Sequence, residues 1–276
     1  MLVPQNGENT YGSRSQKDAR RGCSCTCHRA AAMLGKTAPP PTRNLPEMKR
    51  ASIIVAVLAT VAPAAAQADA LQAQLLASAR ATQVDRHGFR RTITIERSGA
   101  ARRVVEERYD PRRAPADRWS LLSIDGRTPT AKEVADMHKA KRGPVPSYAE
   151  IAKFIGAPAT RSDTAPGFVT YRFARLPKGA IKIGNHDASA DLAAEALVDT
   201  RGKTPFVAQV RLTATKGFRM MMVVSVKAMT IVTRYRALAD GHLAPADNAS
   251  TIDGSLLGKS GQIKTAVRFA DFAAVR

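Results

Sequence analysis

The chain has 276 residues, of which 44% are hydrophobic and 5% aromatic, and it carries 43 Lys and Arg against 23 Asp and Glu, a formal net charge of +20. This excess of positive charge favours anionic partners such as nucleic acid, phospholipid headgroups or lipopolysaccharide. The basic residues are dispersed with little aromatic interleaving, and no RRM, KH or helix-turn-helix pattern is visible, so we expect no nucleic-acid partner.

Residues 1–47 have neither helical nor strand periodicity and include the run Pro39-Pro40-Pro41. They are either an upstream extension from a start codon placed too early, with Met48 the true start, or a genuine disordered leader. The segment contains Cys23, Cys25, Cys27 and His28. Zinc sites usually take cysteine pairs from two separate places, so this single run predicts no metal site.

Residues 48–66 have the order of features found in a secretory signal peptide. Lys49 and Arg50 precede an apolar run at 51–62, and three alanines at 64–66 form an A-x-A-type cleavage site that leaves Gln67 as the mature N-terminus. A buried core helix followed by an Ala-rich linker is one alternative. A retained membrane anchor is the other, although a spanning helix needs about 20 apolar residues.

The mature chain, 67–276, is therefore expected to be a single periplasmic β-rich domain with no stable membrane span. It is 210 residues long, enough for one domain with a real core. The first 66 residues hold nine of the basic and three of the acidic residues, which leaves a mature net charge of +14. All three cysteines precede residue 67, so disulfides, a thiol nucleophile and a lipid-bearing cysteine are excluded from the mature part.

The first half of the mature chain mixes helices and strands. Helical spacing places Leu71, Leu75, Leu76 and Ala79 on one side of residues 69–80. Strands are expected at 88–97, 101–110 and 118–126, where alternation puts Phe89, Arg91, Ile93 and Ile95 on one face. Two short helices then begin at the capping boxes Thr130/Glu133 and Ser147/Glu150, the second with Tyr148, Ile151, Phe154 and Ile155 inside.

The second half is predicted to be nearly all strand. The expected strands cover 168–173, 192–200, 205–213, 220–227, 230–238, 250–256 and 261–272, with turns near 201–203, 215–217 and 239–241. Nine or ten antiparallel strands form a sheet that curls or closes. Three short helices can cover its concave face and leave an apolar hollow. The fold class is thus mainly β (α+β).

The order of elements and the C-terminal passage resemble the periplasmic lipoprotein-carrier superfamily, the LolA–LolB fold. Its turn and final-strand positions correspond here to Tyr235, Asp240, Gly241, Pro245, Gly258, Lys259, Asp271 and Phe272. The resemblance implies an unclosed antiparallel barrel with helices as a lid. It also implies binding of acyl chains or another hydrophobic ligand, with no chemistry.

The candidate lining of the hollow comes from two alternating patterns and one tryptophan. Phe206, Ala208, Val210 and Leu212 share one face, and Met220, Met222, Val224 and Val226 share another. Methionine adapts to varied apolar ligands, although ordinary core is the alternative for this run. Trp119 is a core or rim anchor. The predicted ligand-binding residues are Trp119, Phe206, Val210, Met220, Met222 and Val224.

A metal-dependent phosphoesterase is the remote alternative. Three short segments are similar, in their order along the chain, to the metal-binding motifs of metallophosphoesterases that hold two metal ions. They are Asp85-Arg86-His87, Gly184-Asn185-His186-Asp187 and Asp240-Gly241-His242. No G-D-x-x-D-type element lies between the first two pieces and G-H-x-H is absent. G-x-S-x-G, P-loop and H-E-x-x-H motifs are also missing. We therefore expect no enzyme, no catalytic residue, no metal and no cofactor.

Two non-enzymatic functions remain open. One is an exported carrier with a hydrophobic hollow, whose basic surface helps it to dock on anionic envelope lipids. The other is an envelope interaction protein that has a fully packed core and acts through that basic surface.

Overall fold

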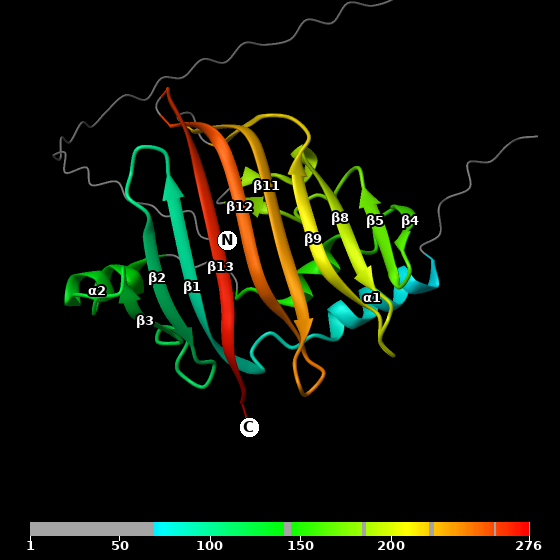
Figure 1. Cartoon of the computed structure of the whole chain (residues 1–276), viewed down its shortest axis with the longest axis horizontal. Coiled ribbons are helices and arrows are strands. Elements are labelled where there is room, and N and C mark those ends of the chain that lie inside the picture. The colour runs from blue at the N-terminus through cyan, green and yellow to red at the C-terminus, as the bar shows by residue number, and fades with distance from the viewer. Residues whose placement is uncertain (1–68, 141–144, 184–185, 221–223, 257, 276) are drawn as a thin grey trace, which may run out of the picture. The chain divides into compact units, whose positions relative to one another are not determined.

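The computed structural model describes residues 69–140, 145–183, 186–220, 224–256 and 258–275 (Figure 1). The segment 1–47 and the predicted signal peptide at 48–66 lie outside this range, so both remain predictions. The helices are α1 (Ala70–Ala81), α2 (Ala131–Lys139) and the 3-10 turns η1 (Tyr148–Lys153) and η2 (Ser189–Asp191). Among these described helices, none has the length and hydropathy needed to cross a bilayer.

The strands form one wide antiparallel sheet and one small hairpin. The first seven strands are β1 (His87–Arg97), β2 (Arg103–Tyr109), β3 (Trp119–Ile124), β4 (Thr160–Ala165), β5 (Phe168–Phe173), β6 (Lys182–Ile183) and β7 (His186–Asp187). The others are β8 (Leu192–Asp199), β9 (Phe206–Ala214), β10 (Phe218–Met220), β11 (Val224–Ala237), β12 (Leu243–Leu256) and β13 (Lys259–Ala274).

The large sheet has eleven strands in the order β3-β2-β1-β13-β12-β11-β9-β8-β5-β4, with β10 beside β11, and β6 and β7 pair separately. Its end strands, β3 and β4, do not pair with each other, so the sheet is not closed. The predicted class, a mainly β fold built on an unclosed antiparallel sheet, is confirmed. The C-terminal strand β13 lies in the middle, between β1 and β12 (Figure 1).

Two β-bulges correct the predicted strand pattern. In β9 the pairing shifts between Leu197 and Val198 of the neighbouring strand, so Ala208 is an extra residue and Val207 points into the core, fully buried. In β11 a shift at Lys227 keeps 224–237 as one strand, where alternation alone predicted two. The predicted turn at 215–217 separates β9 from β10, but these two strands both pair with β11 and not with each other.

The apolar side chains form two separate clusters. The first lies where α1 and η1 cover β5, β8, β9 and β11, and it includes Leu75, Tyr148, Phe173 and Val207, each fully buried. The second is aromatic and consists of Phe89, Tyr109, Trp119 and Phe269, with ring centroids 5.0–5.7 Å apart for the contacting pairs. The two clusters lie on the two halves of the sheet, one on each side of β12.

Helix α1 is fixed to the sheet by polar contacts as well as by leucines. Its N-cap, Asp69, accepts hydrogen bonds from the Gln72 N–H at 2.8 Å and from the Tyr171 hydroxyl at 2.6 Å. These bonds and the Arg161 guanidinium 3.0 Å away hold the pKa of the Asp69 carboxyl below its usual value, against the opposing effect of desolvation. The start of the helix is therefore tied to β4 and β5.

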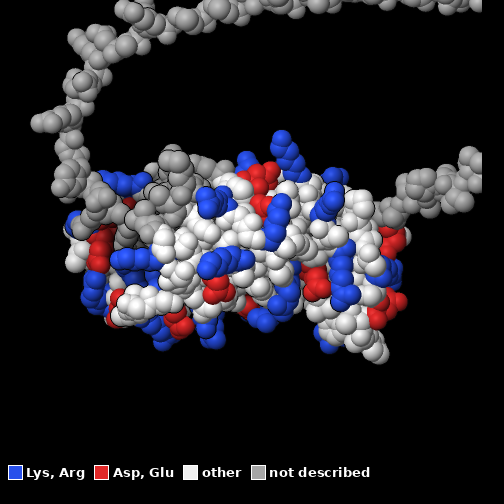
Figure 2. Space-filling view, turned by 90° about the horizontal axis from the view of Figure 1, so that it is seen from above, with Lys and Arg blue, Asp and Glu red and all other residues white. Residues whose placement is uncertain are grey.

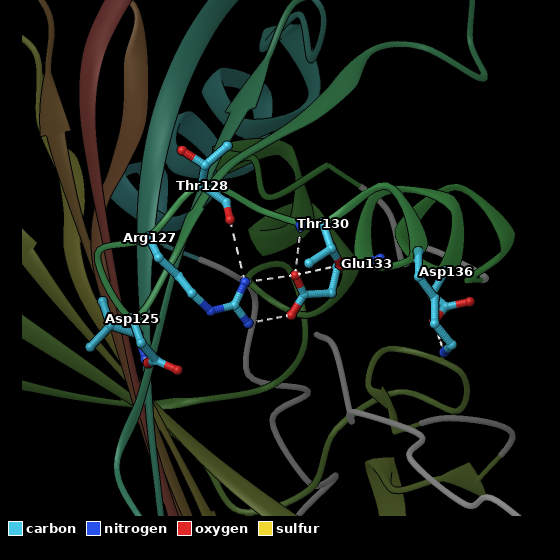
Figure 3. Close-up of polar contacts among 8 residues, drawn as sticks. Asp125, Arg127, Thr128, Thr130, Glu133 and Asp136 are labelled. Atoms are coloured by element: carbon cyan, nitrogen blue, oxygen red, sulfur yellow. Dashed lines mark hydrogen bonds and ion pairs between the residues drawn. The ribbon is translucent and has the colours of Figure 1, made fainter.

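Helix α2 begins at the predicted capping box, which the structure confirms (Figure 3). Thr130 accepts from the Glu133 N–H, and the Glu133 carboxylate accepts from the Thr130 N–H at 2.8 Å. Arg127, in the turn after β3, reaches the same carboxylate at 2.6 Å, so this ion pair joins α2 to the end of β3. The second predicted box does not form, because η1 is a 3-10 turn in which Glu150 pairs with Lys153.

Candidate functional site

The face of the sheet that meets α1 and η1 can be followed across all strands through the pairing register. On β11 it contains Met229 and Ile231, which lie opposite Ile252 and Ser250 of β12. From β12 it continues to β13, β1 and β2 through the pairs Ser250–Thr265, Ile93–Val267 and Ile93–Val105. We call this the inner face, and it includes the predicted Phe89–Arg91–Ile93–Ile95 row.

The two halves of the inner face are buried to different degrees. On β5, β8 and β9 its side chains are almost completely buried under α1 and η1, as for Tyr171, Ala196 and Leu212. On β1, β2 and β13 the isoleucines and valines are only half-buried. Helix α2 lies at the edge of this second half, where it contacts β3.

Four of these half-buried residues form an apolar strip that belongs to neither cluster. The strip consists of Ile93 and Ile95 on β1, Val105 on β2 and Ile263 on β13. Ile93 and Val105 are directly opposite each other, and Ile95 lies two residues further along the same face. Four branched apolar side chains are thus gathered on an interior-facing surface and are still partly accessible.

A buried ion pair borders the strip on the side of the second cluster. The Arg91 Nε donates to Glu107 Oε2 at 2.8 Å, and the two side chains are 7% and 6% exposed. The Arg91 guanidinium also lies 3.9 Å from the centre of the Trp119 ring, a cation–π geometry. The sequence contained a sign of this pair, because Arg91 and Glu107 interrupt two otherwise apolar rows, but pairing them required the register.

The other end of the strip has two exposed arginines. Arg97 is paired with Ile263, and Arg103 is paired with Ile95, so both belong to the inner face. Their positions are diagonal neighbours across the β1–β2 hairpin, about 7–8 Å apart. The described carboxylates make no ion pair with either guanidinium. The strip therefore runs from a buried, neutralised ion pair to two accessible positive charges.

The six predicted lining residues are not brought together. Trp119 is buried in the second cluster at one end of the sheet. Val210 is buried in the first cluster and Phe206 packs against it, on β9, which five strands separate from β3 in the sheet order. Val224 is half-buried at the start of β11, Met220 is placed only by its β10 backbone, and Met222 lies outside the described residues. Their role in ligand binding remains a prediction, and the strip was not found from the sequence.

The three phosphoesterase-like pieces are divided between opposite ends of β11. His87 Nε2 lies 3.0 Å from Asp240 Oδ2, and its ring is 4.6 Å from that of His242, beside the Ala237 end of β11. His186 instead pairs with Asp191 at 3.0 Å and stacks on Phe218, which is opposite Val226. Eleven residues of strand separate the two places, roughly 35 Å. These side chains cannot hold one pair of metal ions, and the described residues contain no other cluster with metal-ligand geometry.

The His87–Asp240 contact joins the start of β1 to the β11–β12 turn. Asp240 also accepts from the His242 N–H at 3.0 Å, and this bond contributes most to holding the pKa of the Asp240 carboxyl below its usual value. Burial and the neighbouring His87 lower the pKa of His242 below 6.5. These groups therefore fasten one end of the sheet and are not part of the strip.

Comparison with known proteins gives one structural likeness. No protein-family model and no curated protein matches the chain. The structure is similar to the crystal structure of a LolA superfamily protein from Nitrosomonas europaea, with 10% sequence identity, a TM-score of 0.31, and coverage of 75% of this chain and 94% of that chain. At this TM-score the two structures superpose only loosely, so the likeness carries no argument about function.

Proposed function

We propose that this chain is an exported periplasmic binding protein that carries an acyl chain or another apolar ligand on the inner face of its open sheet. In this proposal the protein catalyses no reaction. The apolar strip is the observation that supports the proposal. Its four side chains are on the interior side of the sheet, yet they are left half-buried where the equivalent residues under α1 and η1 are sealed.

An apolar ligand would bind to the strip because apolar surface exposed to water is unfavourable. Moving a fully exposed isoleucine or valine into the interior gains about 1.5–3 kcal/mol, of which a half-buried side chain has only a part left to gain, and each methylene of the ligand that leaves water gains about 0.8 kcal/mol. A flexible alkyl chain lying along Ile93, Ile95 and Ile263 would therefore be stabilised from both sides. Binding of this kind needs no charged group and no metal.

The test is a binding titration with single-chain lipids. Trp119 is the only tryptophan in the chain and lies beside Arg91 at the border of the strip, so its fluorescence reports on ligand there. Myristate and 1-tetradecanol are the probes, and equilibrium dialysis gives their dissociation constants. We expect Ile93→Asn to weaken binding by about tenfold or more, because an apolar contact is replaced by a polar group.

Thr94→Asn is the matched control, because Thr94 is also half-buried on β1 but lies on the outer face. Thermal melts establish that both variants are folded, and Val105→Asn is a second substitution within the strip. If the wild-type protein binds neither lipid, or if Ile93→Asn and Thr94→Asn bind equally well, the strip is not a ligand site.

A second candidate function uses the basic edge where β1 ends and β2 and β13 begin, at the top of Figure 1. Figure 2 looks down on the molecule from this side, and the Lys and Arg side chains visible there are spread among fewer acidic ones. Arg97, Arg103, Arg219 and Lys259 are exposed and form no ion pair with a described residue. Such a surface suits an anionic membrane. Salt-sensitive binding to phosphatidylglycerol vesicles by a protein that binds no single-chain lipid would favour this alternative.

Export is part of the proposal and has its own test. The signal peptide predicts a mature protein that begins at Gln67, and an intact mass measured on protein from the native periplasm determines the first residue. A peptide from before Met48 in the mature protein would contradict the predicted start.

A further inference from the structure

We propose that the ligand is an anionic amphiphile, a single alkyl chain that ends in a carboxylate or phosphate, and that Arg97 and Arg103 bind its headgroup. This inference rests on the proposed function and narrows it to one ligand class. It comes from a juxtaposition that only the strand register reveals: two accessible guanidinium groups at one end of an accessible apolar strip.

The distances suit one molecule that contacts both features. Along β1, Ile93 and Arg97 are four residues apart, about 14 Å in an antiparallel strand. Arg103 is directly opposite Ile95, so the side chain that carries the second guanidinium leaves the backbone beside the strip. An alkyl chain lying on Ile93, Ile95 and Ile263 therefore brings its headgroup within reach of both arginines.

The other charged groups near this end are already engaged or lie on the opposite face. Glu96 precedes Arg97 on the outer face, where its carboxylate is 3.9 Å from Arg102. Asp125, in the turn after β3, accepts a hydrogen bond from the Val104 N–H at 2.6 Å. Glu133 is held by Arg127. Asp125 keeps its negative charge, since its partner is a neutral N–H, but no described carboxylate forms an ion pair with Arg97 or Arg103, so both guanidinium groups remain available at this end.

The opposite end of the strip explains why the headgroup would bind at only one end. There the positive charge of Arg91 is paired with Glu107 and covered by Trp119. An anion placed beside this pair would be repelled by Glu107, and its desolvation would not be compensated. The ligand avoids this repulsion and loss of hydration when its alkyl tail points toward the ion pair and its headgroup lies at Arg97 and Arg103.

Arginine suits the proposed headgroup chemistry. Its planar guanidinium donates two parallel hydrogen bonds to a carboxylate or a phosphate, and these charge-assisted bonds are stronger than neutral ones. Two guanidinium groups that are diagonal neighbours can hold one headgroup between them. A neutral headgroup would gain only ordinary hydrogen bonds there.

The experiment compares lipids that share a chain and differ in charge. Myristate, tetradecyl phosphate and 1-tetradecanol are measured by equilibrium dialysis against the full mature protein, Arg97→Gln, Arg103→Gln and the double variant. Arg102→Gln is the matched control, since Arg102 is in the same hairpin, is exposed and belongs to the outer side. We expect each single variant to bind the anionic lipids about five- to tenfold more weakly and to bind 1-tetradecanol as the wild type does.

Three outcomes distinguish this inference from the proposed function. Weaker binding of either anionic lipid by the inner-face variants, with Arg102→Gln unchanged, supports it, and the preferred anion identifies the headgroup. Equal affinity of the wild type for 1-tetradecanol and the anions, or unchanged binding in the double variant, overturns it but leaves the carrier proposal intact. Failure of the wild type to bind any of the three lipids overturns both.

Discussion

The attachment of α1 to the segment that follows η1 depends on one buried glutamine. The Gln72 side-chain amide donates to the carbonyl oxygen of Ile155 at 2.6 Å and to that of Ala157 at 2.7 Å, and Gln72 is 4% exposed. Gln72→Met keeps the size and apolar stem of the side chain but removes both donors. A buried acceptor left without a donor costs about 1–3 kcal/mol, and since the bond to Ala157 is only partly buried, the loss of both should lower the free energy of unfolding by about 2–4 kcal/mol.

Urea denaturation followed by circular dichroism measures this loss. A thermal melt gives a second readout. For a domain of 150–250 residues, 1 kcal/mol corresponds to about 2–4 °C in melting temperature, so we expect the melting temperature to decrease by roughly 5–15 °C. Gln74→Met is the control, because Gln74 is in the same helix but exposed, and it should change stability by less than about 0.5 kcal/mol. If the two variants unfold at the same urea concentration, the two bonds do not hold α1 in place.

Three further predictions concern the sheet and its ends. Gly254→Ala should destabilise the protein strongly, because the new Cβ would lie 2.1 Å from a backbone oxygen, whereas Gly261→Ala has no atom closer than 3.7 Å and should melt like the wild type. Because the pKa of His242 is lowered on folding, the unfolded chain binds its proton first, and stability should fall as the pH drops below 6.5. His242→Asn should reduce the difference between the melting temperatures at pH 7.5 and pH 5.5. If that difference is the same as in the wild type, His242 is not the source of the pH dependence. Thr130→Ala removes the cap of α2, so hydrogen exchange of the first α2 amides should accelerate while that of α1 stays unchanged.

Regular alternation made most of the sheet predictable. Strands β1, β5 and β13 follow their apolar rows, and Leu75 and Ala79 of α1 are fully buried as helical spacing indicated. The polar strand β4 could not be found, because Thr160–Ala165 has no apolar face and serves as a sheet edge. The strand β8 was expected at 192–200, and its small residues Ala194 and Ala196 are buried in the first cluster.

The bulges and the candidate site depend on contacts between distant residues. Gly254 lies opposite the β11 bulge, where its lack of a side chain permits the close approach of Ser225, and a glycine within a strand is a known sign of this. The apolar strip could not be deduced, because Ile93 and Leu212 look alike in the sequence. One is half-buried and the other buried only because α1 and η1 cover one half of the inner face.

The N-terminal helix connects the predicted export of the protein to its folding. Cleavage after Ala66 would leave the N-cap Asp69 as the third residue of the mature chain, which keeps its bonds to Gln72, Tyr171 and Arg161 possible. Cleavage even three residues later would remove that carboxylate, and with it the tie between α1 and the β4–β5 edge. Since α1 seals one half of the inner face, the place of cleavage would also affect which half remains accessible. A mature protein that begins at Gln67 would therefore keep the N-cap of α1 and the contacts that hold this helix on the first half of the inner face.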